Sequence, residues 1–310
     1  MRPLRIGSRG SVLAMWQANA VRGRLERLVG VEAEIVTIKT SGDRFQQPNV
    51  AQIGLKGVFI KELEDALLEG SVDFAVHSMK DVPTQIPAGL AFPAICERED
   101  VRDALLSRSG AKLAALPAGA RIGTSSLRRQ AQIRHVRPDL DLGDLRGNVD
   151  TRLRKLERGD YDAIVLAKAG LDRLGWSSKI TEVIPPEVSL PAVGQGALGI
   201  EARADDREVL EVLAQLEHPP TRVAVTAERA LLAELEGGCQ VPLGAWARFE
   251  QGALVLDACV LSVDGIESVR QRTVGIPRDA EALGRELAQT MLAAGADRIL
   301  KLAGRDIGTG

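Results

Sequence analysis

Cysteine is scarce in this chain of 310 residues, which contains only Cys96, Cys239 and Cys259. The three are odd in number, far apart and outside any Cys-x-x-Cys pair, so the sequence predicts neither a disulfide framework nor a metal site of the zinc type. The first residues contain no apolar signal core, and no later run is long enough to cross a bilayer. These absences favour a soluble protein of the reducing cytoplasm.

A strong charge of either sign is also missing, because the formal net charge is only -2. A global basic field for nucleic acid is therefore excluded, and any anion-binding site must be local. The sequence has no G-x-x-x-x-G-K loop followed by Ser or Thr and no strand-linked G-x-G-x-x-G. This argues against a phosphoryl-transfer enzyme.

Short apolar runs alternate with helical patterns, which is typical of α/β lobes with mainly parallel sheets. The first lobe is expected to have strands at 4–8, 32–39 and 72–77 and helices at 11–28 and 57–68. The second is expected to have strands at 121–123, 141–145 and 162–166 and helices at 126–136 and 149–158. Residues 94–100 and 190–197, here named the first and second crossing segments, are predicted to join the lobes as a hinge.

The pattern changes near Pro219, where a smaller α+β domain is predicted. It should contain a helix to Glu236, strands at 245–249, 254–261 and 268–274, and a helix at 279–294 with a core stripe of Leu283, Leu287, Met291 and Leu292. The predicted domains are therefore 1–96 with 197–216, 101–191, and 219–310. The polar segment 40–57 is a candidate lid.

Four strand-to-helix junctions carry cationic and hydroxyl side chains, at 7–11, 77–81, 123–129 and 145–152. Ligands of open α/β sheets bind at the carboxyl ends of strands. Helix N-termini there offer unpaired N–H groups, and arginine forks complete a site for carboxylate or phosphate. Several such junctions indicate a ligand with several anionic groups.

Simpler interpretations of these residues exist. Arginine outnumbers lysine 31 to 9, so its density is partly compositional, and the arginines in mid-helix or at helix ends are interpreted as surface residues: Arg134, Arg137, Arg154 and Arg158. Thr124 or Ser125 could serve only as a helix N-cap. His77 is interpreted as a core residue, since it has no evident partner. Asp81 is a candidate stabiliser of a developing cation, with a salt bridge as the alternative.

Cys239 lies in the sequence Glu236-Gly237-Gly238-Cys239-Gln240, where a predicted helix ends. Free cysteine usually behaves as a small hydrophobe, so residue type alone favours a structural role. The two preceding glycines free the backbone and remove the bulk that would bury the sulfur, which favours an accessible thiol.

Together these motifs closely resemble the porphobilinogen deaminase (hydroxymethylbilane synthase) family, in order and over essentially the whole chain. The resemblance rests on the segments at 6–14, 77–81, 123–129, 145–149 and 236–242, with two more at 95–100 and 192–197. It implies two lobes like those of type II periplasmic binding proteins and a third domain that carries the cysteine. The implied protein is a cytoplasmic monomer without metal, nucleotide or redox cofactor.

The resemblance also implies the reaction. Four porphobilinogen molecules are joined head to tail with release of ammonia, and hydrolysis then frees the linear tetrapyrrole. The chain grows on a dipyrromethane cofactor attached by a thioether to the residue that matches Cys239. An ionised carboxylate matching Asp81 stabilises the azafulvenium cation left by the loss of ammonia.

Roles follow residue by residue from the same resemblance. Cofactor-binding positions are matched by Lys80, Asp81, Thr124, Ser126, Arg128, Arg129 and Cys239. Substrate and lid positions are matched by Arg9, Ser11, Gln17, Lys56, Arg146, Arg152 and Arg173. Two residues depart from the family pattern: Val12 replaces a common proline, and Gln52 replaces a lysine that some members have on the lid.

A rival from another class is a non-catalytic solute-binding module, because two hinged lobes with anion-binding junctions would suit it. Cys239 discriminates between the two, since a binding protein has no use for an accessible thiol facing the cleft.

Overall fold

The computed structural model describes residues 2–40, 60–235 and 241–308, with the backbone alone for residues 304–308. Its contacts divide the chain into two compact units, Met1–Glu99 with Gly196–Arg222 and Asp100–Gln195 with Val223–Gly310. The chain passes between units at 99/100 and 195/196, and these points fall inside the first and second crossing segments.

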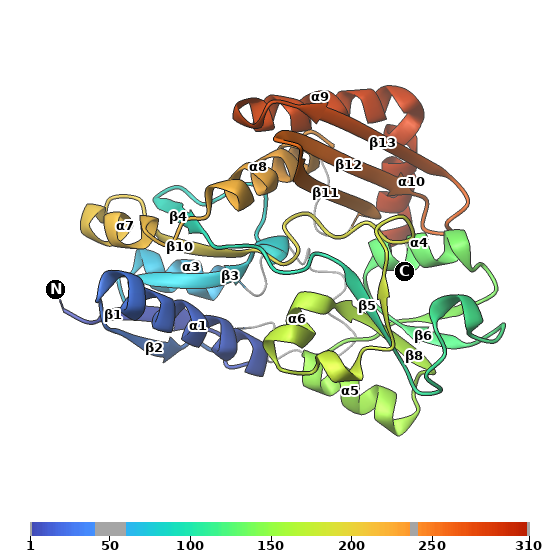
Figure 1. The fold of residues 1–310 in the computed structure, drawn as a ribbon, viewed down its shortest axis with the longest axis horizontal. Helices are drawn as coiled ribbons and strands as arrows, with labels where there is room; N and C mark the ends of the chain where they lie inside the picture. The colour runs from blue at the N-terminus through green and yellow to red at the C-terminus, as the bar shows by residue number, and fades with distance from the viewer. Residues whose placement is uncertain (1, 41–59, 236–240, 309–310) are drawn as a thin grey trace. The chain divides into compact units, whose positions relative to one another are not determined.

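The first unit is built on a five-stranded sheet with the order β2-β1-β3-β10-β4 (Figure 1). Its strands are β1 (Leu4–Ser8), β2 (Ala33–Thr37), β3 (Phe74–Ser78), β4 (Leu90–Ile95) and β10 (Leu198–Arg203). β1 pairs in parallel with β2 and β3, whereas β10 runs antiparallel to β3 and β4. The helices are α1 (Val12–Val29), α3 (Lys61–Leu68) and α7 (Arg207–Ala214), and the short 3₁₀ turn η2 (Met79–Asp81) follows β3.

The second unit contains another five-stranded sheet, with the order β7-β6-β8-β5-β9. Its strands are β5 (Asp103–Ser107), β6 (Arg121–Gly123), β7 (Asp141–Gly143), β8 (Ala163–Ala167) and β9 (Glu182–Ile184). β6 pairs in parallel with β7 and β8, and β5 runs antiparallel to β8 and β9. The helices are α4 (Leu127–Val136), α5 (Val149–Arg158) and α6 (Lys168–Arg173).

The two sheets share one topology. Each has three parallel strands in the order second, first, third, then an antiparallel strand, then an outer strand. The antiparallel strand is in each case the first strand after a crossing segment: β5 after the first, β10 after the second. This is the arrangement of type II periplasmic-binding-protein lobes, so the predicted fold class is confirmed. The strands β4, β5, β9 and β10 were not predicted, and residues 94–95 of the first crossing segment belong to β4.

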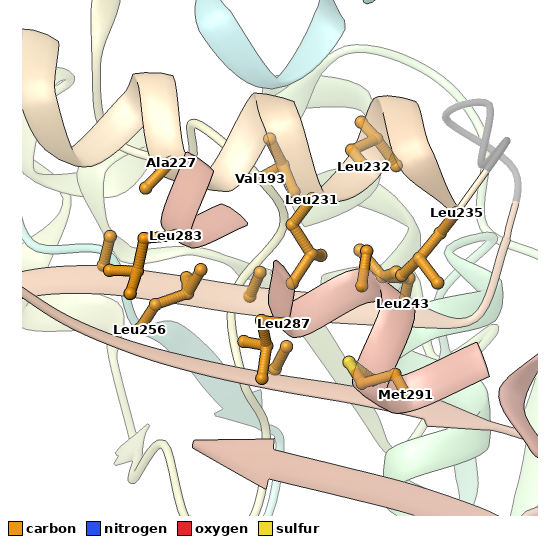
Figure 2. Packing of buried hydrophobic residues seen from close by; sticks show 14 of the residues in the cluster. Val193, Ala227, Leu231, Leu232, Leu235, Leu243, Leu256, Leu283, Leu287 and Met291 are labelled. Carbon is orange, nitrogen blue, oxygen red and sulfur yellow. The ribbon is translucent and has the colours of Figure 1, made fainter. Parts of the chain in front are cut away.

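The second unit also holds an antiparallel three-stranded sheet of β11 (Leu243–Glu250), β12 (Ala253–Leu261) and β13 (Ser268–Gly275). The helices of this part of the chain are α8 (Pro219–Glu234), α9 (Ala280–Met291) and α10 (Asp297–Gly308). Figure 2 shows side chains of α8, the sheet and α9 meeting in one core, among them Leu231, Leu256 and Leu287. The predicted stripe on α9 is confirmed as core, with Leu292 only half-buried.

Helices α8 and α9 approach closely at Gly284. A Cβ atom there would lie 2.2 Å from the carbonyl oxygen of Ala227 and 2.9 Å from the Cβ of Ala230. By contrast, a Cβ on Gly23 of α1 would meet only the end of Arg27, at 3.4 Å. The same substitution in these two helices should therefore have opposite effects.

Gly284→Ala is expected to lower the free energy of unfolding by about 1–3 kcal/mol, because α9 must move off α8. Gly23→Ala is expected to raise it by about 0.5–1 kcal/mol, because alanine is the better helix former. Denaturant unfolding of both variants measures the difference. A neutral Gly284→Ala would show that the two helices are not in close contact.

Candidate active site

Five predicted site residues lie at one edge of the first sheet. β1 and β3 are parallel neighbours, so their carboxyl ends lie at the same edge, where residues 9–11 follow β1 and η2 follows β3. The Nε2 of buried Gln17 on α1 donates to Ser78 Oγ at 3.0 Å and links the two junctions. The structure thus brings together the predicted residues of this unit: Arg9, Ser11, Gln17, Lys80 and Asp81.

The turn that carries Asp81 is held from its buried side. Met79 is 2% exposed, and its N–H donates to the carbonyl of Ala197 at 3.0 Å. A Cβ atom on Gly199 would lie only 2.2 Å from the sulfur of Met79. The absence of a side chain at Gly199 therefore leaves room for Met79. Lys80 is half-buried and Asp81 is exposed. The packing therefore fixes the backbone of η2 while the carboxylate faces outward.

His77 lies in the interior, as predicted. Its Nε2 is 2.9 Å from Oε2 of Glu201, and both side chains are buried. The imidazole also lies beside the ring of Phe92, with centroids 6.0 Å apart. His77 therefore joins β3 to β10.

The parallel strands of the second sheet also end at one common edge. β6, β7 and β8 are parallel, so residues 124–126, residues 144–148 and α6 follow them at the same end. Ser126 caps α4 by accepting from the N–H of Arg129 at 3.5 Å. The suggested caps Thr124 and Ser125 are wrong, because Thr124 Oγ1 accepts from the N–H of Ser126 at 3.3 Å and Ser125 Oγ donates to Leu145 at 2.9 Å.

Three further predicted arginines lie at the ends of these elements. Arg146 is exposed and 3.3 Å from Asp144, Nε of Arg152 donates to the carbonyl of Gly147 at 2.7 Å, and Arg173 is buried at the end of α6.

The four arginines interpreted as surface residues divide into two pairs. Arg154 and Arg158 are exposed, as expected. Arg134 and Arg137 are only half-buried and bind backbone carbonyls: Arg134 that of Val263, and Arg137 those of Leu113 and Leu116. The surface interpretation is wrong for these two, because each guanidinium closes a loop onto α4.

Arg128 and Arg129 have their guanidinium groups in a buried charge cluster around Asp103. Arg128 Nη1 donates to Asp103 Oδ2 at 2.7 Å and to the carbonyl of Leu190 at 2.6 Å. Arg129 donates from Nη2 at 2.7 Å and Nε at 3.1 Å to Asp103 Oδ1, and from Nη1 to the carbonyl of Val165 at 3.1 Å. Both arginines are less than one tenth exposed, and Asp103 is fully buried.

The cluster carries more positive than negative charge. Burial alone would raise the pKa of Asp103, but the two guanidiniums hold that pKa well below its ordinary range. Burial lowers the pKa of Arg128, and the carboxylate of Asp103 opposes this effect. Two guanidiniums share one carboxylate, and Nε of Arg128 is buried without a hydrogen-bond partner among the residues that the structure describes.

Sequence reasoning missed Asp103, Ser189 and Gln195. Ser189 Oγ donates to Asp103 Oδ2 at 3.1 Å, and Gln195 Nε2 donates to Oδ1 at 2.9 Å. The available signal was an aspartate that opens an apolar run, Asp103-Ala104-Leu105-Leu106, because a charge at a core position needs a buried partner.

Two predicted residues, Lys56 and Cys239, lie outside the described residues, as does Gln52. The other two cysteines, Cys96 and Cys259, are buried. Within the described ranges, no three His, Cys, Asp or Glu side chains are grouped to hold a metal ion. Every helix of those same ranges is too short or too polar to cross a membrane.

Two family models match the chain. The model described as "Porphobilinogen deaminase, dipyromethane cofactor binding domain" matches residues 4–211. The model described as "Porphobilinogen deaminase, C-terminal domain" matches residues 223–293. Between them they span both crossing segments and all three sheets.

Individual proteins agree with the family models. The porphobilinogen deaminase of Moorella thermoacetica is 55% identical over 302 residues, which cover 97% of this chain and 96% of that protein. The porphobilinogen deaminase of Geobacter metallireducens is 54% identical over 300 residues, 96% of this chain and 94% of that protein. A solved structure, the periplasmic VFT2 domain of Bordetella pertussis BvgS, is 14% identical with a TM-score of 0.43 and covers 69% of this chain and 86% of that chain. So distant a likeness supports no statement about function.

Cys259 is expected to be unreactive in the native protein. Its thiol is 2% exposed, and burial raises its pKa to about 11, so only about 0.1% is thiolate at pH 8. Iodoacetamide labelling followed by peptide mass mapping should modify Cys259 in urea but not in the native state. Equal labelling rates in the two conditions would contradict its buried position.

Proposed function

The chain belongs to the porphobilinogen deaminase (hydroxymethylbilane synthase) family, and from that membership we propose which of its residues carry each part of the reaction. The protein is a transferase of tetrapyrrole biosynthesis with a dipyrromethane cofactor. It condenses four porphobilinogen molecules head to tail with release of ammonia, and hydrolysis yields the linear hydroxymethylbilane. The observation that carries this conclusion is the match of both family domains along nearly the full chain.

The residues of the second unit fit a cofactor that bears carboxylates. The cluster of Arg128 and Arg129 has one positive charge more than Asp103 neutralises, and Arg128 retains a buried donor. A bidentate or charge-assisted bond to a carboxylate would satisfy both. When bound, the cofactor supplies the terminal pyrrole carbon that serves as the nucleophile for chain growth.

The proposed cofactor contacts include hydroxyls and a thiol as well as cations. Thr124 and Ser126 lie at the N-terminus of α4, where the helix dipole favours an anion. Lys80 adds a cation from the edge of the first sheet. We assign the covalent attachment to Cys239, through a thioether.

Asp81 is the proposed catalytic residue. Loss of ammonia leaves porphobilinogen as an azafulvenium cation, and a fixed carboxylate near the pyrrole nitrogen stabilises that charge. The exposed carboxylate on η2 can approach the ring, while the buried Met79 holds the turn. The same carboxylate can accept the pyrrole N–H in the ground state and strengthen that bond as the charge develops.

The remaining junction residues are proposed to bind the acetate and propionate groups of the substrate and the growing chain. Each added unit brings two carboxylates, so the cations must be distributed over several junctions. This set consists of Arg9, Ser11, Gln17, Lys56, Arg146, Arg152 and Arg173. In the structure, Gln17 is the member that holds the edge itself, through its bond to Ser78.

We further propose three domains, 1–96 with 197–216, 101–191, and 219–310. Each proposed domain contains one of the three sheets, which supports this division. The cytoplasm as the location and a monomeric state are proposals as well, supported by the scarcity of cysteine and by the family.

Intact mass spectrometry tests the attachment site. The purified chain should exceed its sequence mass by a two-pyrrole adduct, and Cys239→Ser should remove that adduct because no thioether can form. Cys259→Ser is the matched control and should retain it, since the Cys259 thiol is buried. An active chain of unmodified mass would overturn the assignment of Cys239.

Asp81→Ala tests the catalytic carboxylate. Turnover should fall about 100-fold or more, because the cation loses its fixed counter-charge. The adduct and the unfolding midpoint should change little, since Asp81 is exposed. Asp279→Ala, which removes another exposed carboxylate, is the control and should keep normal turnover. Near-normal turnover of Asp81→Ala would remove it from catalysis.

A further inference from the structure

Asp103 is the fully buried carboxylate to which four side chains donate. It is the first residue of β5 and is 0% exposed. Arg128 and Arg129 come from α4, whereas Ser189 and Gln195 come from the chain just before and within the second crossing segment. One aspartate therefore joins a strand, a helix and a crossing segment.

These bonds leave the two guanidiniums little freedom. Arg128 Nη1 is shared between Asp103 and the carbonyl of Leu190, and Arg129 uses all three of its nitrogens on Asp103 and Val165. The donor without a partner is Nε of Arg128. The orientation of both groups is thus set before any anion binds.

The charges of the cluster also indicate that Arg128 and Arg129 are held together before a ligand binds. Two guanidiniums of like charge, each less than one tenth exposed, repel one another unless an anion lies between them. Asp103 is that anion, and it compensates only one of the two charges. The pair can therefore stay together in the absence of a ligand and still attract a carboxylate.

We propose that Asp103 is a positioning residue for cofactor capture: it holds Arg128 and Arg129 side by side in the cofactor-free chain, with one net positive charge directed at the cofactor's carboxylate. This inference rests on the proposed cofactor role of the two arginines. Asp103 makes no contact with the cofactor or substrate in this role, since its oxygens are used by the four donors. Ser189 and Gln195 support it by fixing the carboxylate.

A merely structural role would lower stability without changing cofactor capture, and the chain offers a matched control for that difference. Asp73 is also fully buried and pairs with Arg2, Arg5 and Arg203 in the first unit, although these arginines are more exposed than Arg128 and Arg129. Asp73→Asn and Asp103→Asn each remove the charge of a buried carboxylate that binds arginines. Only Asp103 belongs to the cluster of the cofactor arginines.

The experiment measures the fraction of the purified full-length chain that carries the two-pyrrole adduct, with the unfolding midpoint alongside. Both variants should be less stable than the parent chain. Asp73→Asn should load fully, whereas Asp103→Asn should load at least tenfold less. Equal loading of the two variants would overturn the proposal.

Ser189→Ala provides a milder variant in case Asp103→Asn does not fold. It removes the hydrogen bond from Ser189 Oγ to Asp103 at 3.1 Å and the longer one that Ser189 Oγ accepts from Arg128 Nη1 at 3.4 Å, and it leaves every charge in place. Cofactor-free chain given porphobilinogen should acquire the adduct about fivefold more slowly than the parent, the factor that corresponds to one ordinary hydrogen bond. An unchanged rate would overturn the proposal.

Arg128→Leu separates this inference from the proposed function. It should yield mostly adduct-free chain. Full loading of Arg128→Leu would show that the proposed cofactor role of Arg128 is wrong. An unloaded Arg128→Leu together with fully loaded Asp103→Asn and Ser189→Ala would overturn the positioning role of Asp103 alone.

Discussion

The rest of the second unit depends on one constraint, the burial of the Asp103 carboxylate together with the guanidiniums of Arg128 and Arg129. Taking ions out of water costs several kcal/mol each, and the cost is offset only where partners and hydrogen bonds meet them with good geometry. Arg128, Arg129 and Asp103 therefore require β5, α4 and the second crossing segment to lie in fixed positions. Removing one partner of such a group typically costs about 3–5 kcal/mol, so the same bonds that orient a site also hold the fold.

The second crossing segment receives further bonds from the C-terminal sheet and helix. The N–H of Gly194 donates to the buried carboxylate of Glu228 on α8 at 2.7 Å, and that carboxylate also accepts from the N–H of Ala247 on β11 at 2.8 Å. A Cβ on Gly244 would lie 2.8 Å from Leu190, so β11 lies directly against the segment. Within the second unit, a shift of this segment would therefore disturb its hydrogen bonds to both α4 and α8.

The sequence predicted elements whose signal is local and missed those whose stability comes from distant partners. The strand Leu4–Ser8 and the helix Val149–Arg158 were predicted with their exact bounds, from an apolar run in one case and from amphipathic spacing in the other. β10 was missed because Glu201 breaks its apolar pattern, and β5 was missed because the apolar run that follows Asp103 is short. The side chains that donate to Asp103 lie 25 to 92 positions away in sequence. A local sequence pattern cannot show which distant residues these are. The arginines at strand ends could be predicted, since parallel topology alone fixes where such junctions meet, but their dependence on Asp103 could not.

Asp81 and Asp103 show why the two carboxylates cannot exchange roles. The charge of Asp103 is compensated by two guanidiniums in the interior, so it has little field left to offer a developing cation and serves instead to orient its partners. Asp81 is exposed on a short turn whose backbone is held by the buried Met79. In its proposed role, an approaching pyrrole that excludes water would strengthen the interaction of this carboxylate with a developing cation. The two proposed roles therefore require opposite environments: Arg128 and Arg129 are oriented by burial within a sheet-and-helix interior, whereas Asp81 is exposed at a strand end.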